Sequence, residues 1–531
     1  MPATAKVDYS TDPATIEIPR DYNAAVEFID VHASAGRSGK TAFIDDAGAY
    51  TYAELAQRVN RAGNALQALG AELETRVMLC MLDTVDMSAV FWGVIKAGAV
   101  AIPVNTLLTP QDYEYIVKDS RARILVVSAA LYDTLAPVIA EAPHLKEIVI
   151  AGGSRDGHQS LEDLMASAGD TLMPADTTAD DVAFWLYTSG STGTPKGSMH
   201  LHSDLVCTAV HYGKGVLGIR EDDVVFSAAK MFFAYGLGNT LTFPLYVGAT
   251  AAVIAGRPTP DSVLGALQKH QASIFYGVPT LYAAILADEK NDRERVSQRL
   301  RLCVSAGEAL PGDVGTRWQE KFGAEIIDGL GSTEMLHIFL SNVPGDVHYG
   351  TSGRAVPGYR LRVVDEDDQP VAPGEIGELL VDGRSAAVAY WNQRDKSLHT
   401  FMGRWTRTGD KYTVSEDGLY TYCGRTDDML KVSGNWVSPF EVESALIAHD
   451  KVLEVGVVGA QDEAGLIKPK AFVVLHEPGD AGAATATELQ AFVKQSLAPY
   501  KYPRWIEFVD ALPKTATGKV QRFKLRARSP D

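Results

Sequence analysis

The chain has 531 residues, which at roughly 100 to 200 residues per domain predicts two to four domains, or one large domain with an appendage. Hydrophobic residues make up 46% and charged residues 22%, values of an ordinary globular protein that exclude a chain disordered over its whole length. The 49 Lys and Arg residues are outnumbered by 67 Asp and Glu residues, giving a formal net charge of -18. This excess argues against a general nucleic-acid or anionic-membrane binder, so any phosphate ligand must be held by local donors.

The cysteines and the N-terminus favour a soluble, cytoplasmic protein. The first residues carry no apolar core behind a basic start, as a signal peptide would. The most apolar stretch, 89–104, is interrupted by Lys96 and Pro103 and is too short for a membrane span. Four cysteines without C-x-x-C spacing indicate small buried side chains rather than a disulfide framework or zinc site. They are Cys80, Cys207, Cys303 and Cys423.

In chain order, the first 180 residues alternate helical and strand patterns. Thr51 and Glu54 form a capping-box signature, after which apolar residues recur at helical spacing as far as Leu69. A continuous apolar run at 77–82 predicts a strand covered on both faces. A helix near 86–97 and strands at 100–104 and 124–127 continue the pattern. The alternation predicts α/β layers with largely parallel sheets.

In the rest of the chain, the pattern of predicted helices and strands changes twice. Segment 152–182 is polar and acidic and is expected to be a surface connection. Strands, each beside a helical segment, are predicted at 182–187, 223–227, 250–254, 273–276 and 301–305. From about residue 350 to 424, short strands with turn signals predict a β-rich subdomain. Helices at 438–448 and 487–497 with strands at 455–458 and 471–475 then predict a small α+β domain. The expected division is 1–426 and 427–531.

A glycine- and hydroxyl-rich loop follows the predicted strand at 182–187. Its backbone N–H groups, hydroxyls and one lysine can surround phosphate oxygens. The loop differs from a Walker P-loop because Lys196 follows Pro195 rather than Gly and precedes Gly197 rather than Ser or Thr. The residues expected to form this phosphate cradle are Thr188, Ser189, Gly190, Ser191, Thr192, Gly193 and Lys196.

Three further blocks follow in order: SAGEA with DGLGSTE at 305–309 and 328–334, RTGD with YCGRTDDMLKVSG at 407–410 and 422–434, and PKTATGKVQR at 513–522. Together with the loop, they resemble the signatures of the acyl-adenylate-forming superfamily over nearly the whole chain. The resemblance implies a large α/β N-terminal region with a β subdomain and a small, mobile C-terminal domain. It also implies that a carboxylate and MgATP form an acyl-AMP and pyrophosphate.

By this resemblance, the turn at Gly307 and Glu308 lies against adenine, and Asp328 and Gly329 belong to the same nucleotide site. Thr333 would contact the α-phosphate. Glu334 would help to hold Mg²⁺, a hard cation that prefers oxygen ligands, with ATP supplying most of the others.

The third and fourth blocks imply roles for the second half of the site. Asp410 would accept hydrogen bonds from the ribose hydroxyls with the help of Arg425, and Asp427 matches the hinge of the C-terminal domain. Lys519 matches the lysine that stabilises charge developing during adenylation. Gly434 matches a glycine that lines the pantetheine tunnel of acyl-CoA synthetases, so coenzyme A is the expected acceptor.

The acid is indicated by the segment KMFFAYG at 230–236. Amino-acid-activating relatives commonly have an aspartate where this chain has Ala234, which argues against an α-amino acid. Aromatic and small residues suit a flat ring better than a long chain. The expected pocket residues are Phe233, Ala234, Tyr235, Tyr276, Gly331, Leu336 and His337. Each aromatic could equally be a core residue, and His337 could be a core histidine, a pocket wall or a partner for a ring hydroxyl.

The pattern is most similar to that of benzoate-CoA ligases, with 4-hydroxybenzoate and 2-aminobenzoate ligases as alternatives. More distant alternatives are a luciferase-like adenylate-using oxygenase and a non-catalytic nucleotide-binding module. The expected partners are an aromatic acid, ATP, Mg²⁺ and coenzyme A, without nucleic acid or membrane. Monomer and homodimer both stay open.

Overall fold

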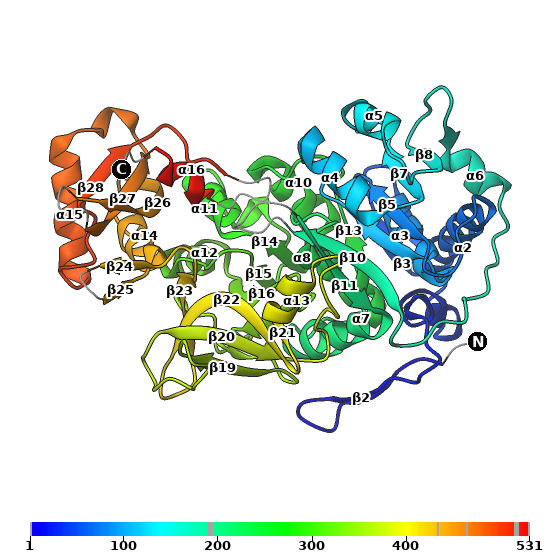
Figure 1. Ribbon diagram of the computed structural model, residues 1–531, viewed down its shortest axis with the longest axis horizontal. Helices are drawn as coiled ribbons and strands as arrows, with labels where there is room; N and C mark the ends of the chain where they lie inside the picture. Colours follow the sequence, from blue (N-terminus) through cyan, green and yellow to red (C-terminus); the bar gives the residue numbers. More distant parts are fainter. Residues whose placement is uncertain (1–2, 189–194, 433–434, 463–465, 515–519, 529–531) are drawn as a thin grey trace.

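The computed structural model describes residues 3–188, 195–432, 435–462, 466–514 and 520–528. A large N-terminal region and a smaller C-terminal domain lie next to each other along the longest axis of the molecule (Figure 1). The predicted α/β class, with a separate α+β domain at the C-terminus, is confirmed.

The first sheet of the N-terminal region has seven strands and is parallel except for its last strand, β11, which pairs antiparallel with β10. In spatial order the strands are β11 (Lys196–Leu201), β10 (Val182–Thr188), β6 (Val100–Pro103), β5 (Arg76–Cys80), β7 (Ile124–Ser128), β8 (Glu147–Ala151) and β9 (Gln159–Ser160).

Helices cover both faces of this sheet, as expected for parallel strands that are apolar on both sides. On β5, Met78 and Cys80 point to the core formed with α4 (Pro110–Ser120) and α5 (Tyr132–Ala140). The alternate residues Val77 and Leu79 point to the core formed with α2 (Tyr52–Ala68) and α3 (Val85–Lys96). The Thr51 side chain caps α2 in a capping box with Glu54, as the sequence predicts.

The second sheet has nine strands, parallel in its centre and antiparallel at both ends. The strands are, in spatial order, β18 (Arg354–Ala355), β17 (Ile338–Ser341), β16 (Glu325–Gly331), β15 (Leu302–Ser305), β14 (Ile274–Gly277), β12 (Val224–Ser227), β13 (Thr250–Ala252), β3 (Thr41–Ile44) and β4 (Ala49–Thr51). One face packs against α10 (Pro260–His270), α11 (Pro279–Ala287) and α12 (Gly312–Phe322). The other face shares one continuous core with the first sheet, in which α2, α3 and α7 (His202–Thr208) also pack.

A five-stranded antiparallel sheet forms the β-rich subdomain (yellow in Figure 1). Its strands are β19 (Arg360–Val364), β20 (Gly377–Asp382), β21 (Phe401–Met402), β22 (Trp405–Val414) and β23 (Tyr420–Arg425), with α13 (Arg394–Thr400) beside them. The chain then passes through a turn that contains Asp427 and enters the C-terminal domain.

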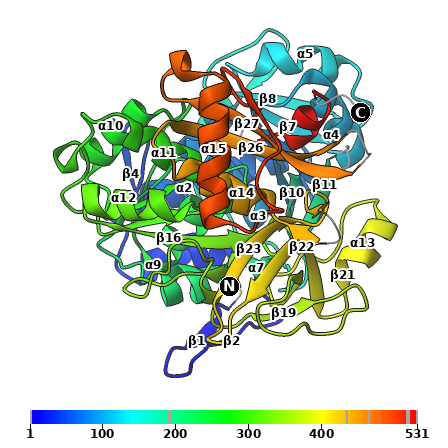
Figure 2. The same ribbon diagram turned by 90° about the vertical axis from the view of Figure 1, so that its left-hand side faces the viewer.

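The C-terminal domain has a three-stranded sheet with helices on both faces. The sheet contains β26 (Val452–Gln461), β27 (Ile467–Leu475) and β28 (Trp505–Phe508). One face packs against α14 (Pro439–Ile447) and α15 (Ala483–Ser496), and Figure 2 shows α15 lying across the sheet. Leu525 of α16 (Arg522–Arg526) packs on the other face. The strands β24 (Leu430–Val432) and β25 (Asn435–Val437) form a separate hairpin.

The expectation for segment 152–182 is wrong in part, because the segment contains β9 and α6 (Leu161–Ser167) rather than only a surface connection. Ser160 caps α6 by accepting a hydrogen bond from the Asp163 N–H, and Leu161 and Met165 are buried in the core shared with α2. Other short elements are β1 (Lys6–Asp8), β2 (Thr15–Glu17), α1 (Val31–Ser34), α8 (Ala234–Leu237), α9 (Phe243–Val247) and the π-helices η1 (Val26–Asp30), η2 (Ala209–Val216) and η3 (Gly238–Thr242).

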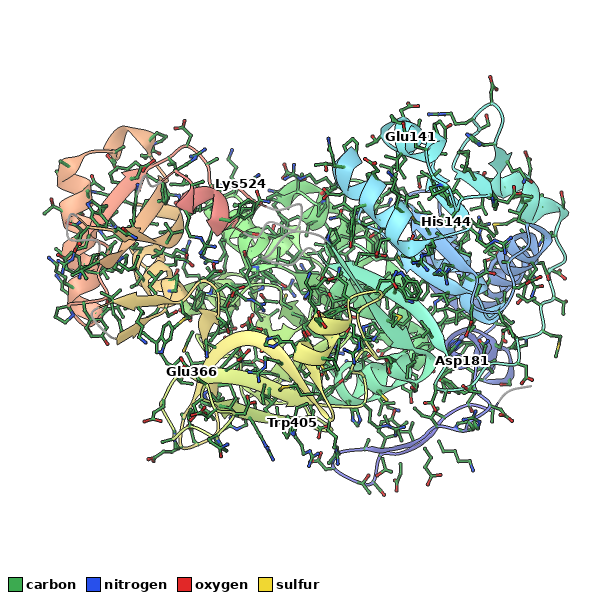
Figure 3. The ribbon with its side chains drawn as sticks, viewed as in Figure 1. Glu141, His144, Asp181, Glu366, Trp405 and Lys524 are labelled. Atoms are coloured by element: carbon green, nitrogen blue, oxygen red, sulfur yellow. The ribbon has the colours of Figure 1, made fainter. Side chains whose placement is uncertain are left out.

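The apolar stretch 89–104 belongs to α3 and β6 and is buried in the core. Among the described residues, no helix is long and apolar enough to cross a membrane. Charged side chains such as Glu141, Glu366 and Lys524 are exposed at the surface, as Figure 3 shows. The acidic excess of the chain is therefore compatible with an apolar interior.

Candidate active site

The predicted phosphate cradle lies at the edge of the first sheet. Thr188 ends β10 and Lys196 begins β11, and the two residues face each other across the antiparallel pair. This hairpin fixes both ends of the connection between the strands. The other predicted cradle residues, Ser189, Gly190, Ser191, Thr192 and Gly193, lie outside the described residues.

Lys196 and Glu334 come together although 138 positions separate them in sequence. The Lys196 Nζ atom lies 3.8 Å from Oε1 of Glu334, and about a fifth of each side chain is exposed, 19% and 18%. Burial lowers the pKa of Lys196, and the negative charge of Glu334 opposes this effect. The two predicted ligands of phosphate and Mg²⁺ thus share one half-buried space.

Tyr390 connects these two side chains. Its hydroxyl donates a hydrogen bond of 2.6 Å to Oε1 of Glu334 and accepts one of 3.1 Å from Lys196 Nζ. The Ala387 N–H, three residues earlier, donates to the Glu334 carbonyl oxygen at 2.7 Å. Tyr390 was not a predicted site residue, because a tyrosine beside a tryptophan carries no sequence signal for such a contact.

A buried histidine holds the backbone of Thr333. His200 Nε2 lies 2.7 Å from the Thr333 carbonyl oxygen, and His200 Nδ1 lies 2.9 Å from Asp204 Oδ2. Because a carbonyl oxygen can only accept, Nε2 carries a proton, and the Nδ1 contact requires one further proton that His200 and Asp204 share. Burial raises the pKa of Asp204, consistent with this sharing. Neither residue was a predicted site residue, because each resembles an ordinary core residue in sequence.

The predicted ribose site lies where β22 and β23 pair. Asp410 and Arg425 are opposite each other in this pair, and Arg425 Nη1 lies 3.0 Å from Asp410 Oδ1. The Asp410 charge raises the pKa of Arg425. Gly409 has a φ of +72°, and a Cβ atom there would lie 2.8 Å from Arg425 Nη2. The glycine therefore allows the arginine to lie against the strand, next to the turn that contains Asp427.

The predicted adenine site is at the carboxyl ends of β15 and β16. These parallel strands pair Ser305 with Asp328, and the chain after β15 turns at Gly307 with a φ of +93° and continues to Glu308. Within the described part of the chain, Oδ1 of Asp328 and Oγ of Ser305 are buried without a hydrogen-bond partner. Burial raises the pKa of Asp328 to about 8. Unpaired buried groups of this kind are suited to a polar ligand such as a nucleotide base.

Three of the predicted acid-pocket residues form one aromatic cluster. The ring centroid of Tyr235 lies 6.1 Å from that of Tyr276 and 5.6 Å from that of His337. The Tyr235 hydroxyl donates to the carbonyl oxygens of Gly277 and Val304, at 3.2 and 3.0 Å. This anchors the ring at the carboxyl ends of two strands.

The other predicted pocket residues lie on the segments beside this cluster. Phe233 precedes α8, packs on Phe232 at 4.4 Å between ring centroids and is only partly buried. Ala234 begins α8 and is buried. Leu336 adopts a φ of +67°, rare for a side chain of its size, directly before His337.

The pairing of β16 with β17 explains why glycine stands at positions 329 and 331. A Cβ atom at Gly331 would lie 2.8 Å from the His337 carbonyl, and one at Gly329 would lie 2.8 Å from the Ile338 side chain. The close approach of β17 to β16 therefore requires both glycines, whether or not a ring lies beside them.

His337 is buried, and its ring is held through the Nε2 atom. Its Nε2 atom lies 3.2 Å from the Tyr235 carbonyl oxygen and 3.2 Å from Asn239 Oδ1. Burial lowers the pKa of His337 to about 3, so the ring is neutral at physiological pH. Since the carbonyl oxygen only accepts, Nε2 carries the proton, and Nδ1 is an acceptor that is buried without a partner among the described residues.

The C-terminal domain contributes predicted residues that the structure does not describe. Lys519 and Gly434 both lie outside the described residues. Of the residues near Lys519, Lys514 forms an ion pair of 2.5 Å with Glu454, and Arg522 forms one of 2.7 Å with Glu443. The described flanks of the segment are thus anchored to their own domain.

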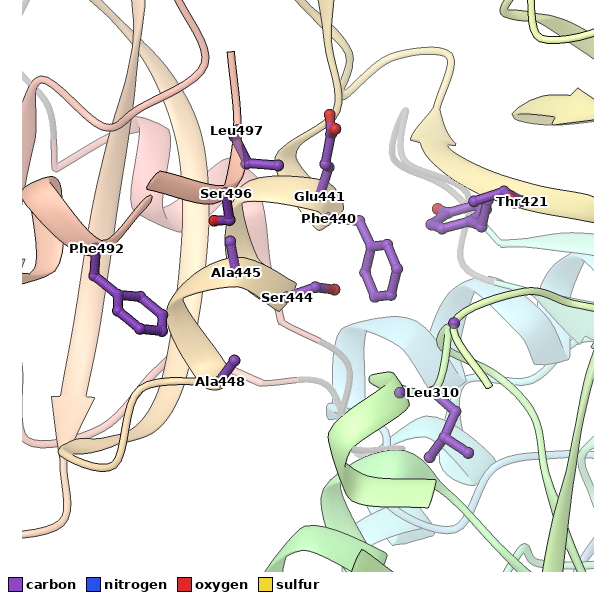
Figure 4. Close-up of a pocket in the computed structure, with 13 residues that line it drawn as sticks. Leu310, Thr421, Phe440, Glu441, Ser444, Ala445, Ala448, Phe492, Ser496 and Leu497 are labelled. Carbon is purple, nitrogen blue, oxygen red and sulfur yellow. The ribbon is translucent and has the colours of Figure 1, made fainter. Parts of the chain in front are cut away.

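A cavity of about 420 Å³ lies between this domain and the N-terminal region (Figure 4). Leu310 lies on one side, close in sequence to Glu308, and Phe440 and Ser444 of α14 lie on the other. The two domains are therefore not fully packed against each other at this boundary.

A site for Mg²⁺ would depend on Glu334. In the described part of the chain, no group of three or more His, Cys, Asp or Glu side chains could hold a metal ion. A single carboxylate beside a phosphate cradle fits an ion that takes most of its oxygen ligands from nucleotide and water.

Comparisons with known proteins identify the family of the chain. The AMP-binding enzyme family matches residues 30–391, and the C-terminal domain of AMP-binding enzymes matches residues 441–519. Benzoate–CoA ligase of Thauera aromatica is 60% identical over 98% of both chains. 4-Hydroxybenzoate–CoA/benzoate–CoA ligase of Rhodopseudomonas palustris is 53% identical over 96% of this chain and 94% of its own.

A solved structure of the anthranilate CoA ligase AuaEII, in complex with anthranoyl-AMP, superposes with a TM-score of 0.93 at 43% identity. It covers 96% of this chain and 98% of its own. The superfamily that the four motif blocks resemble is thereby confirmed, and the chain belongs to the AMP-binding enzymes.

Proposed function

We propose that this protein is an AMP-forming acid–thiol ligase that converts benzoate, ATP and coenzyme A into benzoyl-CoA, AMP and pyrophosphate. The observation that carries the proposal is the 60% identity to a benzoate–CoA ligase along 98% of both chains. The aromatic cluster of the partly buried Tyr235 with the buried Tyr276 and His337 supports an acid with a flat ring. Ala234 offers no charge to an amino-acid ammonium, which supports an acid without an α-amino group.

In the first half-reaction, a carboxylate oxygen attacks the α-phosphorus of ATP, and pyrophosphate leaves. Lys196 and Thr188 would hold phosphate oxygens, and Asp410 would accept hydrogen bonds from the ribose. Mg²⁺ held by Glu334 would neutralise charge on the phosphates. Lys519 would stabilise the charge that develops at the reacting phosphorus.

In the second half-reaction, the thiolate sulfur of coenzyme A attacks the acyl carbon. The carbon–sulfur bond forms, the bond from the acyl carbon to the AMP oxygen breaks, and AMP leaves with its electron pair. Gly434 would line the path of the thiol arm, and the C-terminal domain would rotate about Asp427 between the two steps.

A benzoate with a hydrogen-bond donor on its ring is the second candidate substrate. The observation that favours it is the unpaired, buried Nδ1 of His337, which can accept a hydrogen bond but cannot donate one. A ring hydroxyl or amino group could supply the missing proton donor. The 4-hydroxybenzoate and anthranilate ligases among the relatives are named for acids of these two kinds.

The deciding experiment measures pyrophosphate release and thioester formation with benzoate, 4-hydroxybenzoate, 2-aminobenzoate and octanoate. We expect benzoate to give the highest kcat/KM, with substituted benzoates slower, because one small group changes discrimination by only about 1 to 3 kcal/mol. A loss confined to the hydroxylated and aminated acids in His337→Ala would support the second candidate. Octanoate outcompeting benzoate would contradict an aryl substrate, and ATP binding without pyrophosphate release for any acid would indicate a nucleotide-binding module.

A further inference from the structure

Tyr390 occupies a fixed position between the phosphate and metal sides of the candidate site. Its side chain is 3% exposed, so the hydroxyl cannot exchange its partners freely with water. The flanking backbone pairs with β11, where Met199 N–H donates to Ala389 O at 3.0 Å and Trp391 N–H donates to Gly197 O at 2.8 Å. The Tyr390 N–H donates to Ser397 Oγ at 3.0 Å. The phenol is therefore held on the same strand edge as Lys196.

The direction of the two hydrogen bonds is fixed by chemistry. An ammonium group can only donate and a carboxylate can only accept, so the phenol oxygen accepts from Lys196 and gives its one proton to Glu334. Their lengths are 3.1 and 2.6 Å, whereas the direct distance between Lys196 Nζ and Glu334 Oε1 is 3.8 Å. The hydroxyl thus bridges the two opposite charges from one side. Lys196 and Glu334 stay 3.8 Å apart, within ion-pair distance but too far for the direct hydrogen bond of a closed ion pair.

A closed Lys196–Glu334 ion pair would compete with the phosphate and Mg²⁺ ligands of the proposed reaction. A lysine locked onto Glu334 would have less of its charge available for phosphate oxygens. A glutamate locked onto Lys196 would have less of its charge available for Mg²⁺. At short range in a partly desolvated site, such a direct pair is much stronger than in water.

We infer that Tyr390 is a positioning residue that keeps Lys196 and Glu334 from forming a closed ion pair, so that one can bind phosphate and the other can bind the metal. The inference rests on the proposed function for the identity of these two ligands. Its hydroxyl bonds to Lys196 and Glu334, so the role inferred for Tyr390 is exerted through these two charged side chains.

The test is Tyr390→Phe, which removes only the hydroxyl. We expect the dissociation constant of MgATP, measured by titration calorimetry, to rise roughly 10- to 100-fold, the range for one lost hydrogen bond to a charged group. The Mg²⁺ concentration at half-maximal pyrophosphate release should rise, whereas the KM for benzoate should not. Thioester formation from supplied benzoyl-AMP should change little because that step releases no pyrophosphate.

The matched control is Tyr359→Phe. Tyr359 is also buried in this part of the chain, and its hydroxyl lies 2.7 Å from Ser385 Oγ. This variant should lose a similar amount of thermal stability while MgATP binding and Mg²⁺ dependence stay at the parental values. Equal effects of the two variants on MgATP binding would overturn the inference.

Glu334→Gln decides whether Tyr390 acts through that carboxylate. In the Glu334→Gln background, the additional Tyr390→Phe change should no longer alter the Mg²⁺ dependence. Should Tyr390→Phe fold poorly, Glu334→Gln alone keeps the test, because ATP without Mg²⁺ should bind at least as tightly once the negative charge 3.8 Å from Lys196 is removed. Weaker metal-free binding in that variant would overturn the inference. Pyrophosphate release by the parent is measured first, so failure of the proposed function is recognised separately from the binding results.

Discussion

Gly238→Ala should disturb the acid pocket without touching any residue of the nucleotide site. A Cβ atom at Gly238 would lie 2.7 Å from Nε2 of His337 and closer still to its Cδ2, whereas ordinary contact begins at 3.4 Å. The contact with Cδ2 is the tighter one, so the imidazole ring must move by about 1.2 Å if the backbone holds its position. The same displacement would break the two 3.2 Å contacts of Nε2 to Tyr235 and Asn239.

The expected magnitude follows from these contacts. Overpacking a well-packed core typically costs about 1 to 3 kcal/mol, and each lost hydrogen bond adds about 0.5 to 1.5 kcal/mol. We therefore expect a destabilisation of about 2 to 6 kcal/mol, visible as a fall in Tm. A wall residue misplaced by about 1 Å can lower kcat/KM for benzoate about 100-fold, whereas the KM for ATP should stay within about twofold of the parent.

The matched control is Gly265→Ala on α10, where a Cβ atom meets nothing within 4 Å. That change should be neutral or stabilising by up to about 1 kcal/mol, because alanine favours the helix. Pyrophosphate release at varied benzoate and varied ATP, with melting curves, compares the variants. If Gly238→Ala keeps the parental Tm and kcat/KM for benzoate, His337 is not held beside the acid as described.

Three further predictions concern other parts of the chain. Lys519→Ala should lower the rate of adenylation by about 100- to 1,000-fold, the loss expected for a preorganised charge. The rate of thioester formation from supplied benzoyl-AMP should largely survive. Equal losses in the two half-reactions would contradict the proposed role of Lys519. Gly434→Leu should give the reverse pattern, pyrophosphate without benzoyl-CoA, and normal benzoyl-CoA formation would refute the tunnel assignment. Burial raises the pKa of Glu27 to about 7, so the folded protein binds more protons than the unfolded chain between about pH 4.5 and 7, and stability falls as the pH rises through that range. In Glu27→Gln, the fall in folding stability with rising pH should be smaller than in the parent by up to about 3 kcal/mol. Parallel curves of Tm against pH for parent and variant from pH 5 to 8 would show that Glu27 does not cause the fall.

Local pattern was sufficient for the elements whose determinants lie within one segment. The capping box at Thr51 predicted the start of α2, and the apolar run at 77–82 predicted the buried strand β5. It failed for segment 152–182, because the short helix α6 buries only Leu161 and Met165 and is polar elsewhere. A helix with two buried residues has too weak a periodicity to stand out from a loop.

Pairing between distant segments could not be predicted in the same way. The strand β3 joins the second sheet beside β13, with Phe43 opposite Ala251, although helices and strands of the first sheet lie between them in sequence. The strand β11 reverses direction directly after the phosphate loop, so Lys196 begins a strand rather than ending a loop. Neither pairing changes the local spacing of apolar residues, so that spacing cannot predict either of them.

The same limit separates the site residues that were predicted from those that were missed. Lys196, Glu334, Asp410 and Arg425 lie in motif blocks. The missed residues lie outside them: Tyr390 contacts Lys196 and Glu334, and His200, paired with Asp204, contacts the backbone of Thr333. A supporting residue is recognised only by what it touches. Tyr390 lies 194 positions from Lys196 and 56 from Glu334, and His200 lies 133 positions from Thr333.

The charges of the candidate site explain how so acidic a protein can hold a nucleotide. Two of its carboxylates already have donors within the chain, since Asp410 is paired with Arg425 and Glu334 with Tyr390. Their negative charge is therefore partly compensated before any phosphate arrives. Asp328 differs, because burial raises its pKa to about 8 and favours the neutral form at pH 7. The net charge of -18 thus reflects the whole chain, whereas the ligand would meet a local field set by Lys196, Arg425 and carboxyl groups that are paired or protonated.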